Sequence, residues 1–231
     1  MTERPNRQLG PLSNVTTGLY IVTATCGLVD AVCFLALGGV FAEMMTGNLL
    51  LLALSIGSGD TLGDATHYLP AIGAFMLGAL LGGRILRGHR KLRKWRAGFA
   101  VEWLIVVAAT VVAWYGAPDA RNLSGHAVVG MLALAMGIQN AMVRAHGVPD
   151  LATNVMTVTF TAIVADSRPA GGDNHNWRRR GLSVGLFMTG AALGAFLLKF
   201  GVVWPLVITS LLFTVAMWPL LLGKLPEGMA R

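Results

Sequence analysis

Asp30 is the residue whose type and position point most directly to chemistry in this sequence. It lies roughly midway along an apolar stretch, with no counter-charge within a helical turn on either side. A charged carboxylate at membrane depth costs about 2.5–3.5 kcal/mol on insertion scales, so Asp30 is expected to face a bundle interior, hold a proton or bind a ligand. We predict a cation- or proton-binding site there. The alternative is a neutral aspartic acid that joins two helices by hydrogen bonds.

Three blocks of the sequence occur twice, in the same order and with an offset of about 110 residues. They are segments 27–31, 45–48 and 73–82, which are echoed by segments 137–141, 156–159 and 185–194. Polar residues occupy corresponding places in both copies, as they do in duplicated transporters and channels. The chain is therefore predicted to consist of two related halves.

Asn140 corresponds to Asp30 in the second copy, and Gln139 lies beside it. Only one half then carries a titratable group at this place, which suits a site for one cation or one polar solute near a pseudo-symmetry axis. Asn and Gln side chains also join membrane helices by hydrogen bonds alone, and this explanation stays open for both residues.

A turn of Thr46, Gly47 and Asn48 opens a short apolar segment in the first half. Gly47 tolerates backbone conformations that other residues rarely adopt, while Thr46 and Asn48 are of types that cap a helix N-terminus. Such a terminus at membrane depth attracts an anion or a carbonyl oxygen. The corresponding segment of the second half is rich in hydroxyl groups, from Thr153, Thr157 and Thr159. We predict that both segments line a permeation path, with capping and packing as the alternative.

Composition places these residues in a membrane protein. Hydrophobic residues make up 55% of the chain and charged residues 13%, and the mean hydropathy is +0.63. These values lie well to the apolar side of soluble domains. Apolar segments occur at about 15–40, 44–58, 68–87, 97–116, 125–144, 153–166, 181–200 and 202–222. The second and sixth are shorter than the roughly 20 residues that a spanning helix needs.

The basic loops decide between two topologies, because positive charge gathers on the cytoplasmic side. If every segment crossed the membrane from a cytoplasmic N-terminus, the strongly basic loop 87–96 would lie outside. If the two short segments enter and leave on the same side, this loop, the arginines at 178–180 and both termini all lie in the cytoplasm. We prefer the second topology, and true spans with different breaks remain the alternative.

The predicted fold is an all-α integral membrane protein of two pseudo-repeats. Each repeat has about three spanning helices and one extra short or re-entrant helix, and an odd number of spans makes the second repeat inverted relative to the first. Residues 1–14 are expected to form a cytoplasmic tail and residues 15–222 a single membrane domain, with repeats at about 15–116 and 125–222. Residues 223–231 would form a second cytoplasmic tail.

Other function classes find little support in the residues. No metal-ligand spacing, nucleophile elbow or phosphate-binding glycine loop occurs, so we expect no metal, no cofactor and no enzyme, with an intramembrane enzyme as the third-ranked reading. The net charge of +7 is concentrated in two loops and the termini, which membrane topology explains without nucleic acid.

Glu102 follows the basic loop closely and is expected near the cytoplasmic interface. Segments 78–82 and 190–194 are small-xxx-small motifs that should pack the halves together or join subunits of a homo-oligomer.

The stretch from Gly27 to Phe41, running into Met45-Thr46-Gly47-Asn48, resembles the YoaK family of bacterial inner-membrane proteins. Segments 137–141 and 153–159 share the resemblance, which covers about residues 15–222. It implies a bacterial inner-membrane protein with several spans, and, because the family is classed as a domain of unknown function, it implies no substrate. Many members have Thr-Gly after the methionine of the second repeat, whereas Val158 follows Thr157 here, which argues against a backbone role for glycine at this place.

The function predicted from these observations is transport or channel-type permeation of a small polar solute or ion, proton- or cation-coupled through Asp30. Asn140, Gln139 and the threonine-rich segments would line the path. The rival hypothesis is a membrane scaffold or assembly protein whose polar residues serve helix packing. A transporter requires a polar cavity that reaches the buried carboxylate, whereas a scaffold requires the carboxylate to be buried against a partner donor.

Overall fold

The computed structural model describes residues 14–59, 62–87, 91–146, 156–174 and 176–222. Over these residues the chain is helical and contains no strand. The helices within the described ranges are α1 (Asn14–Ala36), α2 (Met45–Gly57), α3 (Leu62–Ile85), α4 (Lys91–Gly116), α5 (Leu123–His146), α6 (Met156–Ala165), α7 (Trp177–Leu197) and α8 (Val203–Leu222), with 3₁₀ turns η1 (Arg168–Ala170) and η2 (Leu198–Phe200). The predicted all-α fold is confirmed.

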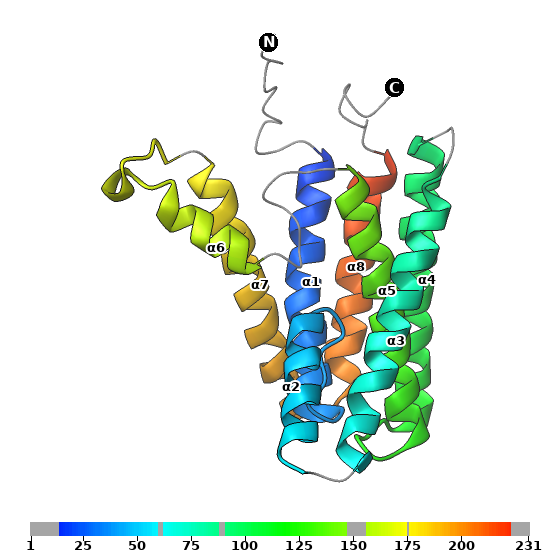
Figure 1. The fold of residues 1–231 in the computed structure, drawn as a ribbon. Coiled ribbons are helices and arrows are strands. Elements are labelled where there is room, and N and C mark those ends of the chain that lie inside the picture. The colour runs from blue at the N-terminus through cyan, green and yellow to red at the C-terminus, as the bar shows by residue number, and fades with distance from the viewer. Residues whose placement is uncertain (1–13, 60–61, 88–90, 147–155, 175, 223–231) are drawn as a thin grey trace.

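The long helices form one bundle whose length and composition suit a bilayer (Figure 1). Five helices within the described residues are long and apolar enough to cross a membrane: Thr16–Ala36, His67–Leu86, Arg93–Gly116, Leu123–Ala145 and Trp177–Phe200. The exposed surface carries many large apolar side chains, among them Leu80, Met188 and Trp218. Such a surface is stable against lipid and not against water. The protein is therefore a multi-pass membrane protein.

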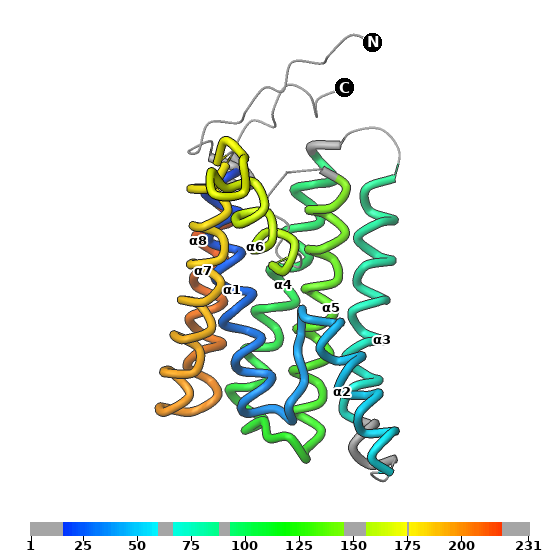
Figure 2. The backbone as a smooth tube through the Cα atoms, turned by 60° about the vertical axis from the view of Figure 1, so that its left-hand side comes forward, coloured from blue at the N-terminus to red at the C-terminus, as the bar shows by residue number. Residues whose placement is uncertain are grey.

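The two short helices, α2 and α6, enter the bundle without crossing it. Their 13 and 10 residues span roughly 20 and 15 Å, against about 30 Å for a bilayer core. Both begin in the middle of the bundle and run toward opposite ends (Figures 1 and 2). Segment 37–44 returns from the end of α1 into the bundle, and α2 then leaves on the side where α1 ended. Segment 37–44 and α2 thus form a re-entrant segment, while re-entry of segment 153–166, which lies partly outside the described residues, stays a prediction.

Corresponding helices of the two halves make corresponding contacts. Helix α1 packs against α7 and α8, while α5 packs against α3 and α4. Figure 1 shows that α1 and α5, and likewise α3 and α7, run in opposite directions. Each half therefore completes its packing with helices of the other half. This arrangement supports the predicted inverted repeat.

Glycines allow the backbones of the crossing helices to touch. A Cβ at Gly190 of α7 would collide with the carbonyl oxygen of Ala24 in α1, and a Cβ at Gly78 of α3 would collide with that of Leu134 in α5. Gly82 and Gly194, one turn further along, face the same two helices. The small-xxx-small motifs therefore join the halves within one chain, which is one of the two uses predicted for them.

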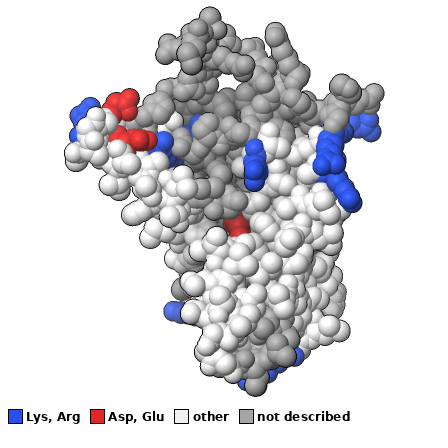
Figure 3. All heavy atoms as spheres, in the orientation of Figure 1, with Lys and Arg blue, Asp and Glu red and all other residues white. Residues whose placement is uncertain are grey.

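Charged side chains gather at the ends of the bundle. Figure 3 shows most lysine and arginine side chains of this face near the end where α1 begins and α8 finishes, with a largely uncharged band below them. Helices α3 and α6 end, and helices α4 and α7 begin, at that same end (Figure 1). The two basic loops and the ends of the membrane domain therefore share one side, as the preferred topology requires.

Candidate functional site

A cavity of about 210 Å³ lies where the N-terminal ends of the two half-crossing helices meet. Its wall takes Met45 and Thr46 from α2 and the corresponding Met156 and Thr157 from α6. Phe75 and Phe187 add an aromatic ring from the corresponding helices α3 and α7, and the remaining described lining residues are Glu43 and Met44. The cavity is thus built from matching residues of both halves, together with one carboxyl group that the described part of the second half does not match.

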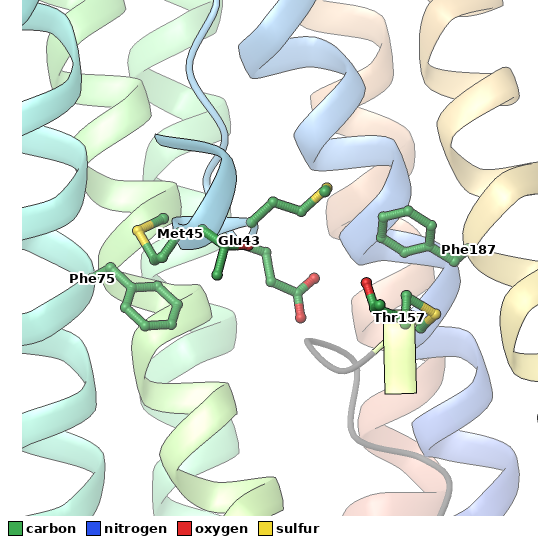
Figure 4. A pocket seen from close by; sticks show the side chains of 8 residues that line it. Glu43, Met45, Phe75, Thr157 and Phe187 are labelled. Carbon is green, nitrogen blue, oxygen red and sulfur yellow. The ribbon is translucent and has the colours of Figure 1, made fainter. Parts of the chain in front are cut away.

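Glu43 is the charged group of this site. It is 2% exposed and lies just before α2, at the inner end of the re-entrant segment. Figure 4 shows its carboxyl group between Phe75 on one side and Phe187 and Thr157 on the other. Glu43 therefore contributes the one ionisable group of the described wall.

Asp30 fixes the position of Glu43 from the neighbouring helix α1. Its Oδ1 accepts hydrogen bonds from the backbone N–H groups of Ala42 and Glu43, both at 2.8 Å. These N–H groups precede α2, whose N-cap residue Met44 has no side-chain capping bond. Asp30 thus supplies the negative group that a helix N-terminus attracts.

Asp30 is not part of the described cavity wall. It is 3% exposed, and its Oδ2 has no hydrogen-bond partner among the described residues. Its carboxyl group interacts electrostatically with that of Glu43. The structure therefore gives Asp30 the partner donors of the scaffold hypothesis and gives Glu43 the cavity of the transport hypothesis.

The Glu43 side chain is connected to the interface between the halves through Cys26 of α1. Cys26 lies close enough to the Glu43 carboxyl group to interact with it electrostatically, and Gln139 Nε2 of α5 donates to Cys26 Sγ at 3.0 Å. Cys26 Sγ also lies 4.0 Å from Met136 Sδ, which is 110 residues further along the chain. Equivalent residues touch each other only near a two-fold axis, so the predicted pseudo-symmetry axis would pass close to this contact.

Asn48 holds the re-entrant segment against α2 and does not cap the helix. Its Oδ1 accepts from the Phe41 N–H at 2.8 Å and its Nδ2 donates to the Phe41 carbonyl at 2.7 Å. Gly47 has ordinary helical geometry, and it is required for space, because a Cβ there would lie 2.9 Å from the Phe41 ring. The predicted reason for Gly47, an unusual backbone conformation, is therefore wrong.

The other predicted site residues divide between the cavity and the packing. Thr46 and Thr157 line the cavity. Asn140 is buried and donates to the Met136 carbonyl of its own helix at 2.9 Å, and Thr159 is buried in α6. Thr153 lies outside the described residues. The path-lining roles of Asn140, Gln139 and the threonines stay predictions.

Glu102 of α4 is a second buried carboxyl group, and the expectation that it lies near the membrane interface is wrong. It is 0% exposed, and it lies about 16 Å along α4 from Lys91, where the helix begins. It interacts electrostatically with Glu43, yet its two carboxyl oxygens have no hydrogen-bond partner among the described residues. No group of three or more His, Cys, Asp or Glu that could hold a metal ion occurs in the described part of the chain.

Comparison with known proteins identifies the family. The profile of the family described as "Protein of unknown function (DUF1275)" matches residues 18–218, which is most of the chain. The chain belongs to this family. The chain is 27% identical over 154 residues to the UPF0700 transmembrane protein YoaK of Bacillus subtilis (strain 168), an alignment that covers 65% of this chain and 66% of that protein. No solved structure matches the chain.

The predicted membership of the YoaK family is thus confirmed, and the family description leaves its function open. The aromatic and acidic residues of the cavity are what the sequence reasoning missed. Phe75 and Phe187 stand at matching places in repeated blocks, so the repeat itself was a signal that could have found them. Glu43 directly precedes the helix N-terminus that the sequence predicted at membrane depth, and this position was the signal that could have found it.

Proposed function

We propose that this member of the DUF1275 family transports a small polar solute or ion across the membrane, coupled to protons through Glu43. The observation that carries the proposal is the cavity of about 210 Å³ at the meeting point of α2 and α6, with one buried carboxyl group in its wall. Half-crossing helices that meet near the midplane of inverted halves are the binding-site architecture of many secondary transporters. A packing scaffold has no need for such a cavity.

Glu43 supplies the coupling in this proposal. A carboxyl group at membrane depth is costly as a bare charge, so it holds either a proton or a cation. Exchange of one for the other, on alternate sides of the membrane, links movement of the solute to movement of a proton. Asp30 is then a positioning residue that holds the backbone of Glu43 in place, while the hydroxyls of Thr46 and Thr157 hydrogen-bond the solute. The solute leaves chemically unchanged, and no enzymatic step is included.

The proposal also orients the protein. The end of the bundle that carries the basic loops would face the cytoplasm, because lysine and arginine gather on that side of membrane proteins. Both chain termini would then be cytoplasmic, and the membrane would be the inner membrane of a bacterium, as in the YoaK family. Cysteine labelling from outside the cell, at Ala117 in the α4–α5 loop and at Arg168 in the α6–α7 loop, tests this: only Ala117→Cys should react.

Flux in proteoliposomes that contain a pH-sensitive dye tests the transport itself. Wild type should move protons only when a particular solute from a panel of small cations, neutral polar molecules and anions is added. Glu43→Gln should abolish the movement, whereas Glu102→Gln removes an equally buried carboxyl group outside the described cavity wall and should retain it. If wild type and Glu43→Gln are both folded and equally silent across the panel, the transport proposal fails and the scaffold hypothesis replaces it.

A further inference from the structure

The chemistry of the cavity wall points to the class of solute. Resting on the proposed function, we infer that the cavity binds a small monovalent organic cation, an alkylammonium ion, between the Phe75 and Phe187 rings with Glu43 as its counter-ion. Three features of the wall support this: its charge, its aromatic rings and its volume.

Charge comes first, because the wall of the cavity contains a carboxyl group in the middle of the helix bundle. Glu43 is the one charged residue among the described lining residues, and an ionised carboxylate at this depth is stabilised by a cation beside it. The positive end of α2, which would otherwise attract an anion, is already occupied by the Asp30 carboxylate through the Ala42 and Glu43 N–H groups. The part of the cavity formed by Glu43 and the N-terminus of α2 therefore favours a cation over an anion.

The rest of the wall separates an organic cation from a metal ion. Phe75 and Phe187 flank the carboxyl group from opposite sides (Figure 4), and three methionines complete the apolar surface. A hard ion such as Na⁺ or Mg²⁺ requires several oxygen ligands, and the described side chains of the wall offer only those of Glu43, Thr46 and Thr157. Aromatic rings and thioethers instead suit an ammonium group that carries alkyl substituents.

The volume indicates the size of ligand that the cavity accommodates. A cavity of about 150 Å³ is large enough for benzene, so the cavity of about 210 Å³ accommodates an ion such as choline. The inferred class is therefore alkylammonium ions of about this size.

Binding to the full-length protein in lipid nanodiscs tests the inference with a matched pair of probes. Choline and 3,3-dimethylbutan-1-ol have nearly the same shape and differ in charge, and pivalate supplies the corresponding anion. In calorimetric titrations choline should bind at least about tenfold more tightly than the neutral alcohol, and more tightly than pivalate. Equal binding of choline and the alcohol, or tighter binding of pivalate, would overturn the inference.

Two variants locate the bound cation. Glu43→Gln should weaken choline at least about tenfold and leave the alcohol unchanged, while Glu102→Gln should leave both unchanged. Phe187→Leu should weaken choline about 2- to 30-fold through loss of the cation–π contact. Phe213→Leu, in a buried core position away from the cavity, is its control. If Glu43→Gln does not fold, Phe187→Leu still decides, because undiminished choline binding would contradict the site.

Flux measured with the same probes separates this inference from the proposed function. Choline that binds through Glu43 but does not cross proteoliposomes would uphold the ligand class and refute transport. Glu43-dependent flux of a neutral or anionic solute, with no choline binding, would uphold transport and refute the ligand class.

Discussion

Removal of the Asp30 carboxylate is the sharpest test of how the re-entrant segment is held. Asp30→Ala takes the acceptor from the Ala42 and Glu43 N–H groups, each now bonded at 2.8 Å to Oδ1. A buried backbone donor left without an acceptor costs about 1–3 kcal/mol, so the two together should lower the free energy of unfolding by roughly 2–6 kcal/mol. Asp30→Asn keeps a carbonyl oxygen at the same place and loses only the charge, which should cost about 1–2 kcal/mol.

Asn140 provides the matched control, because it occupies the corresponding place in the other half. Its amide donates to the Met136 carbonyl in its own helix, and within the described ranges it makes no hydrogen bond to another segment. Asn140→Ala should therefore cost only about 0.5–1 kcal/mol. Unfolding of the three variants by increasing sodium dodecyl sulfate in mixed micelles, followed by tryptophan fluorescence, gives the comparison. If Asp30→Ala is no more damaging than Asn140→Ala, Asp30 does not anchor the segment.

The same variants separate an anchor from an ion site. If Asp30 acts only through the backbone of Glu43, Asp30→Asn should retain solute-dependent proton flux in proteoliposomes at temperatures where it is folded. The sequence-based prediction of a cation or proton site at Asp30 requires the opposite result. Loss of flux in a folded, stable Asp30→Asn protein would return the coupling role from Glu43 to Asp30.

Three further substitutions test the packing. Gly190→Ala should lower the free energy of unfolding by about 1–3 kcal/mol, because its Cβ collides with the Ala24 carbonyl. Gly185→Ala in the same helix meets open space and should be neutral or stabilising. Thermal melting in detergent compares the two variants. Glu102→Met should raise the free energy of unfolding by about 1–2 kcal/mol, since it replaces a buried carboxyl group that lacks partners among the described residues. A lower melting temperature in the same detergent would reveal a partner. Arg180→Gln should cost about 1.5–3 kcal/mol, because its guanidinium binds the end of α6; faster proteolysis of the α6–α7 connection is the readout.

Hydropathy and charge predicted the depth of the elements well. The short segments expected at about 44–58 and 153–166 are α2 at Met45–Gly57 and α6 at Met156–Ala165, and the basic loops share one end of the bundle as predicted. Both signals lie along one dimension, the membrane normal, where apolar length and positive charge have direct energetic consequences.

The direction in which each polar side chain points could not be predicted in the same way. Asp30 and Glu43 are both acids in one apolar stretch, and a single sequence does not distinguish the one bonded to backbone donors from the one in the cavity wall. That difference arises from segment 37–44, which returns into the bundle and brings Glu43 close to Cys26. The sequence therefore predicted the region of the site. It indicated Asp30 as the ion-binding carboxylate, whereas Glu43 is the one in the cavity wall.

The matching rings of the cavity allow a test of whether the two halves act as one site. Phe75 and Phe187 come from corresponding helices and lie on opposite sides of Glu43 (Figure 4). If one cation contacts both rings, Phe75→Leu and Phe187→Leu should each weaken choline by about 2- to 30-fold. The double variant should weaken it by about the product of the two factors, because walls that do not touch each other contribute independently. If the double variant binds choline as tightly as the weaker-binding single variant does, the cation lies against one ring only. The cavity would then belong to one half of the molecule despite its paired residues.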